Sequence, residues 1–233
     1  MKKFKRGLFM NRIELKAKAK EQIKGKIGIL FVISLIIFGI TGLASYLLGK
    51  IPVVGSLIAT IVVAPAFSLS MVMVYLNVAK GGTPKAGDSF EGFHDFWAAF
   101  KVTFLVGLFT FLWSLLFVIP GIIKMYSYSM SLYVLAENKG KKALECIDES
   151  KKMTEGFKMD LFVLGLSFIG WELLGVITFG IAYIWVGPYM NATYANAYLA
   201  LKPQETATEE VAEIAEESKE EPAEEAKAEE AAE

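Results

Sequence analysis

Long apolar stretches alternate with short charged ones along most of the chain. The apolar runs extend over residues 27–49, 53–78, 102–135 and 161–201, and most of the Lys, Arg, Asp and Glu residues lie between or beyond them. As a helix the first run would be about 34 Å long at ~1.5 Å per residue, enough to cross a ~30 Å hydrocarbon core. The pattern predicts an all-α membrane protein whose first run is an uncleaved span and not a secretory signal.

The last two runs are too long for one span each. Residues 102–135 hold Lys124 as their only charge, and residues 161–201 hold only Glu172. As one helix the first of these would be about 51 Å long at ~1.5 Å per residue, so both runs must fold back. Pro120 and Gly121 mark one expected turn, and the uncharged sequence VITFGI marks the other. After Pro120 we favour a full span ending near Glu137, with a short re-entrant limb as the alternative.

The distribution of basic residues predicts the topology. Lys and Arg are frequent in residues 1–26 and in the loops 79–101 and 138–160. Of the three intervening turns, the first holds only Lys50, the second only Lys124, and the third holds neither Lys nor Arg. Six transmembrane helices with cytoplasmic N- and C-termini satisfy this bias. The sequence thus predicts a basic cytoplasmic segment 1–26, a polytopic six-span domain 27–203 in the cell membrane, and an acidic cytoplasmic tail 204–233. Pro65 and Pro188, inside the second and sixth predicted spans, predict kinks.

Three amphipathic segments precede the predicted hairpins. Residues 11–26 combine Asn11 as a candidate N-cap with apolar and basic residues, which predicts a helix lying on anionic headgroups, with a solvated basic helix as the alternative. Five aromatic residues within 90–100 have helical spacing and predict one interfacial helix. Residues 138–160 are the third such segment.

The hairpins resemble one another in sequence. At an offset of 58 residues, 104–123 and 162–181 match at nine of twenty positions, including Trp113 with Trp171 and Gly107 with Gly165. The first hairpin resembles the third more weakly: the sequences Val-x-Pro and Tyr-Leu occur in both, 123 residues apart. The predicted unit is an amphipathic helix followed by a transmembrane hairpin, used three times as parallel repeats.

The composition fits the membrane class and hides a strong charge asymmetry. Apolar residues make up 54% of the chain, and the formal net charge is -1. However, residues 1–203 hold 22 Lys and Arg against 12 Asp and Glu, while 204–233 hold 2 Lys against 13 Glu. The tail is predicted to be a solvated extension. The alternative is an electrostatic clamp on the basic N-terminal surface, or an arm for a basic partner.

The sequence holds no recognisable catalytic, cofactor or metal site. Cys146 and His94 are the only residues of their types, which excludes a disulfide framework and a multi-Cys metal site. No phosphate loop, HExxH or GxSxG sequence occurs, so no enzyme activity, cofactor, metal or nucleic-acid partner is expected.

Two charges and a set of polar residues inside the apolar runs form the candidate intramembrane site. Lys124 and Glu172 either pair with each other, or Lys124 extends outward while Glu172 is protonated or bonded to a hydroxyl. The polar residues of the fourth and sixth segments should face inward. They line a seam for a solute or a lipid headgroup, or they merely hydrogen-bond between helices. The candidate set is Lys124, Tyr126, Tyr128, Tyr133, Glu172, Asn191, Tyr194 and Asn196.

Several stretches carry a family resemblance. IPGIIKMYSYSMSLYVLAEN, ALECIDESKKMTEGFK and LSFIGWELLGVITFGIAYIWVGPYMNATYANAY resemble the bacterial multi-pass membrane proteins grouped as domain of unknown function nine-seven-five, common in Gram-positive bacteria. More distantly, the alternation of loop helix and hairpin is similar to the membrane domain of some glycerophosphodiester phosphodiesterases. The resemblance implies an integral membrane location and supplies no activity, so no catalytic residue follows from it.

Two functions remain as hypotheses. The first is a non-enzymatic scaffold or accessory subunit that engages the lipid bilayer, especially anionic lipids at its cytoplasmic face, or another membrane protein. The alternative is a permease-like protein that moves a small or lipidic solute along the polar seam. A permease needs a continuous polar cavity, whereas a scaffold should bury the same side chains in direct contacts.

Overall fold

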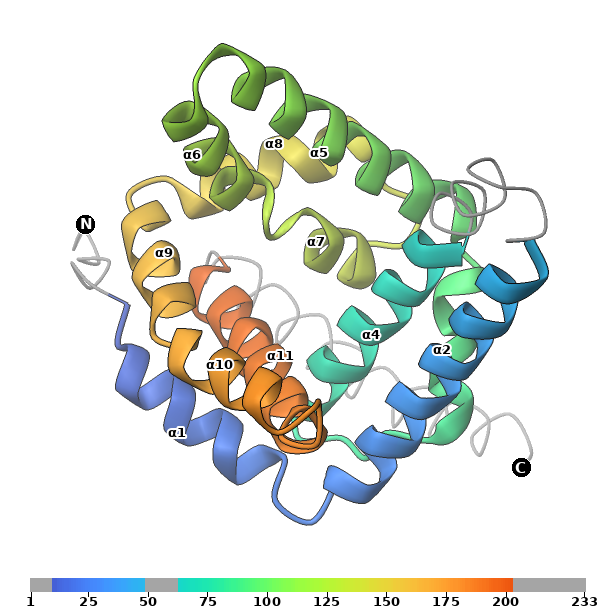
Figure 1. Ribbon diagram of the computed structural model, residues 1–233. Helices are drawn as coiled ribbons and strands as arrows, with labels where there is room; N and C mark the ends of the chain where they lie inside the picture. The colour runs from blue at the N-terminus through green and yellow to red at the C-terminus, as the bar shows by residue number, and fades with distance from the viewer. Residues whose placement is uncertain (1–9, 49–62, 203–233) are drawn as a thin grey trace, which may run out of the picture. The chain divides into compact units, whose positions relative to one another are not determined.

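The computed structural model describes residues 10–48 and 63–202, and all regular structure in these ranges is helical (Figure 1). The elements are α1 (Arg12–Gln22), α2 (Ile27–Leu48), α4 (Ala64–Ala79), the 3-10 helix η2 (Ala86–Phe93), α5 (Phe96–Leu116), α6 (Val118–Tyr128), α7 (Ser131–Glu137), α8 (Ala143–Thr154), α9 (Lys158–Leu166), α10 (Ile169–Ile177) and α11 (Tyr183–Leu201). The predicted all-α class is confirmed for these residues. The turn at Lys50 and the acidic tail 204–233 lie outside them.

Three segments of the described chain are long and apolar enough to cross a membrane. They are Ile27–Leu47, Phe96–Leu116 and Lys158–Ile177, the last of which joins α9 and α10. The apolar helix Ala64–Ala79 is shorter. These lengths support a membrane protein. The six-span arrangement and the threefold repeat stay predictions.

The long apolar segments are exposed, whereas three other helices are largely buried. Within the most apolar stretch of each segment, only 11% is buried in α2, 11% in α5 and 22% in α9–α10. By contrast, α4, α7 and most of α11 bury their side chains; we call these three the central helices. Small and hydroxyl residues such as Ala66, Ser70, Ser131, Ala192 and Thr193 are fully or almost fully buried there, which allows close helix contacts, while bulky apolar side chains face outward, as lipid contact requires.

The first hairpin turn lies earlier than predicted. Phe117, with extended dihedrals of φ -157° and ψ 143°, separates α5 from α6. Pro120 instead lies in the first turn of α6, where its missing N–H leaves no hydrogen bond unmade. Gly121 is needed for packing: a Cβ atom there would lie 2.1 Å from the Ser114 Oγ. The predicted turn at Pro120–Gly121 is therefore wrong by three residues. The last hairpin turns between Ile177 and Tyr183, within and just beyond the predicted VITFGI sequence.

Two segments predicted as continuous are broken. The limb after Phe117 is not one continuous helix but forms α6 and α7, which are interrupted at Ser129 and Met130. It ends at Glu137, as expected, and a full crossing by this limb stays a prediction. The aromatic segment 90–100 is also not one helix, because η2 ends at Phe93 and α5 begins at Phe96. Contact with α4 explains this break. The Gly92 N–H donates to the Ser70 Oγ (2.9 Å), and the rings of Phe67 and Phe93 are 5.0 Å apart.

The remaining prolines and the N-terminal helix have the following places. Pro65 lies in the first turn of α4, and the residues before Val63 lie outside the described part, so a kink there stays a prediction. Pro188 lies inside α11, which continues through it. The predicted N-cap Asn11 is confirmed, because its side chain accepts a hydrogen bond from the Glu14 N–H (3.3 Å).

Helix α1 uses its apolar face for protein contacts. Leu15, Ala19 and Ile23 are buried, whereas Ile13 is 83% exposed. The apolar face therefore packs on the protein, and Arg12, Lys18 and Lys20 are left exposed, whereas Lys16 is half-buried.

Candidate functional site at the ends of the central helices

Each of the three central helices contributes one large buried tyrosine. These residues are Tyr75 on α4, Tyr133 on α7 and Tyr198 on α11. The rings of Tyr133 and Tyr198 stack at 5.4 Å with an interplanar angle of 22°. Tyr75 and Tyr198 are the tyrosines of the two Tyr-Leu pairs that lie 123 residues apart.

Glu137, at the end of α7, connects these helices through its carboxylate. Its Oε1 lies 2.8 Å from the Lys80 Nζ, just beyond α4, and its Oε2 accepts a hydrogen bond from the Tyr198 hydroxyl (2.8 Å). The Glu137 side chain is 9% exposed and that of Lys80 is 50% exposed. A carboxylate so removed from water needs charged and hydrogen-bonding partners, and this one has both.

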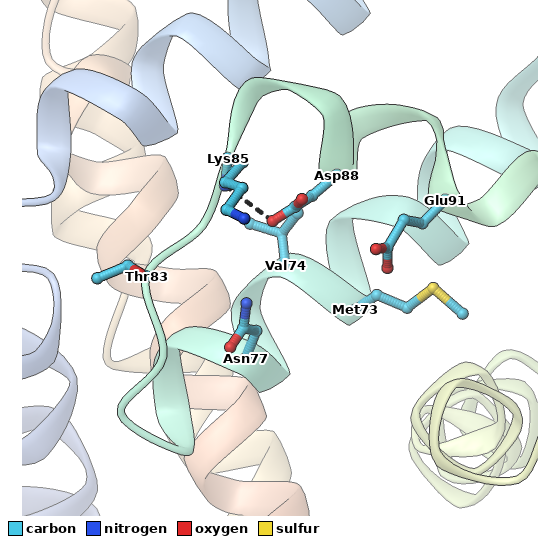
Figure 2. Close-up of a pocket in the computed structure, with 7 residues that line it drawn as sticks. All are labelled: Met73, Val74, Asn77, Thr83, Lys85, Asp88 and Glu91. Carbon is cyan, nitrogen blue, oxygen red and sulfur yellow. Dashed lines mark hydrogen bonds between the residues drawn. The ribbon is translucent and has the colours of Figure 1, made fainter.

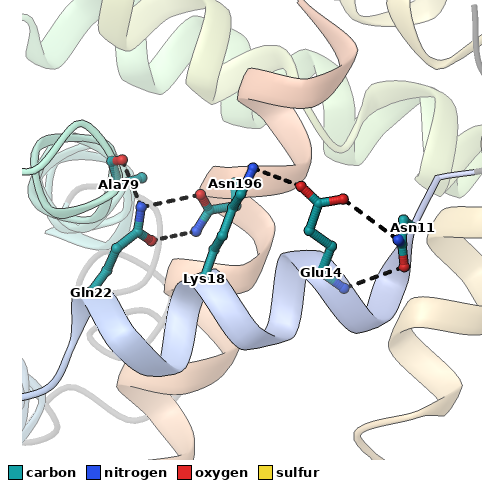
Figure 3. A network of polar contacts seen from close by, with 6 residues as sticks. All are labelled: Asn11, Glu14, Lys18, Gln22, Ala79 and Asn196. Carbon is teal, nitrogen blue, oxygen red and sulfur yellow. Dashed lines mark hydrogen bonds and ion pairs between the residues drawn. The ribbon is translucent and has the colours of Figure 1, made fainter.

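An amide pair fastens α1 to the same region (Figure 3). The Gln22 Nε2 donates to the Ala79 carbonyl (2.8 Å) and to the Asn196 Oδ1 (3.3 Å), and the Asn196 Nδ2 donates to the Gln22 Oε1 (2.6 Å). On the outer side of α1, Lys18 pairs with Glu14 at 2.9 Å. The N-terminal helix is therefore joined by hydrogen bonds to both α4 and α11.

A third set of polar contacts provides hydrogen-bonding partners for the backbone groups at the break between α6 and α7. The Ser150 hydroxyl donates to the Ser127 carbonyl (2.8 Å) and accepts from the Met130 N–H (3.2 Å). The Thr154 hydroxyl reaches the same carbonyl at 3.3 Å. All four residues are buried. Backbone groups released by a helix break need such partners when water is excluded.

These partners escape sequence reasoning because they lie in residues 138–160, predicted as an amphipathic segment between two hairpins. Ser150 and Thr154 are four residues apart on α8, on the same buried face as Cys146, Ile147 and Met153. The hydroxyl spacing within an apolar stripe was the available signal.

The two predicted intramembrane charges have separate partners. The Lys124 Nζ lies 4.6 Å from the centre of the Trp113 ring. The Glu172 Oε2 accepts a hydrogen bond from the Tyr183 hydroxyl (2.7 Å). Within the described residues the two do not pair with each other, and each contact stays inside its own hairpin.

The other predicted site residues fall into separate groups. Tyr133 and Asn196 belong to the contacts described above. The hydroxyls of Tyr126 and Tyr194 both approach Gly165, at 3.0 and 3.2 Å from the position its Cβ would occupy. Tyr128 lies against Phe109 with ring centres 6.2 Å apart, and Asn191 donates to the Gly187 carbonyl of its own helix (2.9 Å).

A cavity of about 380 Å³ lies between α4 and η2 (Figure 2). Its walls include Asn77, Thr83, Lys85, Asp88 and Glu91. The Asp88 carboxylate accepts a hydrogen bond from the Lys85 backbone N–H (2.8 Å). None of the predicted site residues lines this cavity. Among the described residues, no three His, Cys, Asp or Glu side chains are grouped so that they could hold a metal ion.

Burial changes the titration of two groups outside the apolar segments. It raises the pKa of the Cys146 thiol to about 11, so this side chain is neutral at physiological pH. Burial, and then the nearby Arg12 charge, lower the pKa of Lys16. The Lys16 Nζ donates to the Ser167 carbonyl (3.2 Å) and lies 4.1 Å from the centre of the Phe168 ring.

Comparison with known families extends over nearly the whole described chain. The family described as a protein of unknown function (DUF975) matches two overlapping regions, residues 10–127 and 115–205. The chain belongs to this family. The family description states no activity, so the function has to be inferred from the residues of the site. No curated protein and no solved structure matches the chain. The likeness to the membrane domain of glycerophosphodiester phosphodiesterases and the Gram-positive distribution stay predictions.

Proposed function

We propose that the protein is a non-enzymatic membrane scaffold or accessory subunit that engages lipid or another membrane protein. In this proposal three hairpins enter the cell membrane from the cytoplasmic side, where both termini lie. The contacts of the polar side chains support it most directly. Glu137, Tyr198 and Asn196 are bonded to neighbouring helices, and Asn191 and Thr193 are bonded to their own helix. Such contacts hold a bundle together.

A permease-like protein is the alternative, and it requires a different arrangement. The side chains of the seam would have to surround a continuous polar cavity. The cavity between α4 and η2 is instead lined by residues such as Asn77 and Lys85. The scaffold proposal therefore explains the observed contacts better.

The outer surface of α1 favours anionic lipid as a partner. Because its apolar face packs on the protein, Arg12, Lys18, Lys20 and Lys24 are exposed together. Each basic residue near an anionic surface contributes about 1 kcal/mol. Two such residues would then change the affinity about thirtyfold.

The test is purification in a native-like detergent followed by mass spectrometry of the bound lipids and proteins. Replacing Arg12→Gln and Lys24→Gln together should reduce the retained anionic lipid, while the control Glu21→Gln on the same helix should retain it. Equal retention in both variants would contradict the lipid contact. A small molecule bound in a one-to-one ratio would instead favour the permease.

A further inference from the structure

Two hairpin tips expose bulky apolar side chains and carry no charged side chain. The first, which we call the α5–α6 tip, consists of residues 115–119, and the second, the α10–α11 tip, of residues 176–181. Leu115, Phe117 and Ile119 are each more than 70% exposed, and Phe179 is 98% exposed. The one polar side chain, Thr178, donates to the Leu174 carbonyl of its own helix (2.8 Å). Surfaces of this kind are unfavourable in water.

Helix α8 indicates where water begins beside the α5–α6 hairpin. Its Asp148 and Lys151 form an ion pair at 2.7 Å with side chains 61% and 42% exposed. The Lys151 Nζ is 5.8 Å from the centre of the Tyr128 ring. From Tyr128 to Val118, at the tip, α6 rises about 15 Å at ~1.5 Å per residue.

Helix α1 gives an independent measure on the last hairpin. Lys16 donates to the Ser167 carbonyl (3.2 Å), and the neighbouring Arg12 and Lys18 are exposed. From Ser167 to Ile177, at the other tip, the chain again rises about 15 Å at ~1.5 Å per residue.

Both distances equal one leaflet, because the whole hydrocarbon core is about 30 Å thick. We propose that the α5–α6 and α9–α11 hairpins are re-entrant: they enter from the side of α1 and α8 and end near the bilayer midplane, where their tips contact acyl chains. The helices α5 and α9–α10 are long enough to cross, but measured from the charges of α1 and α8 a complete crossing would need about 15 Å more. It would therefore move those charges into hydrocarbon at about 2.5–3.5 kcal/mol for each unshielded charge.

The charges inside the hairpins are compatible with this depth. Lys124 is only four residues from Tyr128, about 6 Å along the helix, so its long side chain can reach the headgroups. Glu172 has the Tyr183 hydroxyl as a partner within the hairpin. The proposal replaces four of the six predicted spans, and it keeps both termini on one side because a re-entrant hairpin changes no sidedness.

Depth-dependent fluorescence quenching tests the proposal. The full chain, with Cys146→Ala, is given one new cysteine by Ile119→Cys or Phe179→Cys, labelled with an environment-sensitive fluorophore and placed in liposomes. Both side chains are exposed, so neither substitution disturbs the packing. Lipids with a nitroxide at the acyl-chain end should quench both positions more strongly than lipids with a nitroxide near the headgroup. A membrane-impermeant thiol reagent should label neither position from either side.

Two control positions calibrate the measurement. Phe38→Cys lies in the middle of α2 and is 77% exposed in the native residue, so the deep quencher should act on it. Leu144→Cys lies on α8, where the native side chain is 55% exposed, and the impermeant reagent should label it.

The outcomes separate this proposal from the membrane location on which it rests. Stronger quenching of the tips by the headgroup nitroxide, or labelling from the side opposite α8, would mean that the hairpins cross the bilayer and would overturn the proposal. Protection from both quenchers and the reagent would mean that protein covers the tips, which also overturns it. Failure at Phe38 as well would instead refute the membrane location and the proposed function.

Discussion

The substitution Ser150→Ala tests whether α8 stabilises the break between α6 and α7. The Ser150 hydroxyl satisfies two backbone groups at once, the Ser127 carbonyl and the Met130 N–H, at 2.8 and 3.2 Å. Alanine removes the hydroxyl without adding volume. The carbonyl keeps its 3.3 Å contact with Thr154, whereas the N–H loses the partner that α8 supplies.

The expected cost follows from this difference. A buried hydrogen-bonding group left without a partner costs about 1–3 kcal/mol, and a replaceable hydrogen bond contributes less. We therefore expect a loss of about 2 kcal/mol in unfolding free energy, or about 4–8 °C in apparent Tm for a chain of this size. The double variant Ser150→Ala with Thr154→Ala removes both α8 hydroxyls from the Ser127 carbonyl, so its loss should exceed the sum of the two single losses.

The chain provides its own reporter for this measurement. Cys146 is the only cysteine and is fully buried, so a thiol-reactive dye added during heating in detergent reports unfolding. Ser129→Ala is the matched control, because its hydroxyl donates to the Tyr126 carbonyl of its own helix (2.8 Å). Equal apparent Tm values for the Ser150→Ala and Ser129→Ala proteins would refute the stabilising role of α8.

Three further outcomes are expected. Tyr198→Phe removes a hydrogen bond to a carboxylate and should cost about 1.5–3 kcal/mol in a thermal unfolding assay; Tyr189→Phe is the control and should cost less. Gly121→Ala places a Cβ atom against Ser114 and should lower stability by about 1–3 kcal/mol, whereas Gly107→Ala, with open space around it, should cost nothing; equal effects would contradict the close contact. Burial raises the pKa of the Cys146 thiol to about 11 from an ordinary 9.0, so labelling of the folded protein at pH 8 should be slow. The stability that the buried, neutral thiol contributes should be lost as pH rises from about 9 to about 11.

The hydrophobic pattern located the long helices because their position depends on local properties. Runs without charge predict α2, α5 and α9–α10, and all three have the required length and hydropathy. Pro120 was misleading because proline fits both a turn and the first turn of a helix. The break at Ser129 was not predictable from nearby residues. The hydroxyl groups that satisfy the backbone at this break come from α8, which follows α7 in the chain.

The site was predictable in its residue types and not in its partners. Polar residues on the fourth and sixth segments were expected to face inward, and Tyr133, Tyr198 and Asn196 are buried. The partners of Tyr198 and Asn196, however, are Glu137, at the predicted end of the fourth segment, and Gln22, in the predicted N-terminal amphipathic segment. Pairings between residues far apart in sequence depend on the tertiary arrangement, and composition gives no access to it.

The polar seam and the apolar tips have one physical explanation if the hairpins end near the midplane. On the limb formed by α6 and α7, polar residues begin at Tyr126, which is where charged α8 lies alongside. On α11 the Asn and Thr residues begin at Asn191, on the part of the helix that approaches α1 through Asn196. Beyond those levels the polar side chains of the two limbs are Lys124, Tyr189 and Tyr183, whose hydroxyl is bonded to Glu172, and Thr178 at the tip is bonded to its own helix. The seam then needs no solute pathway to account for it, because its residues lie where protein and headgroups, and not acyl chains, surround the helices.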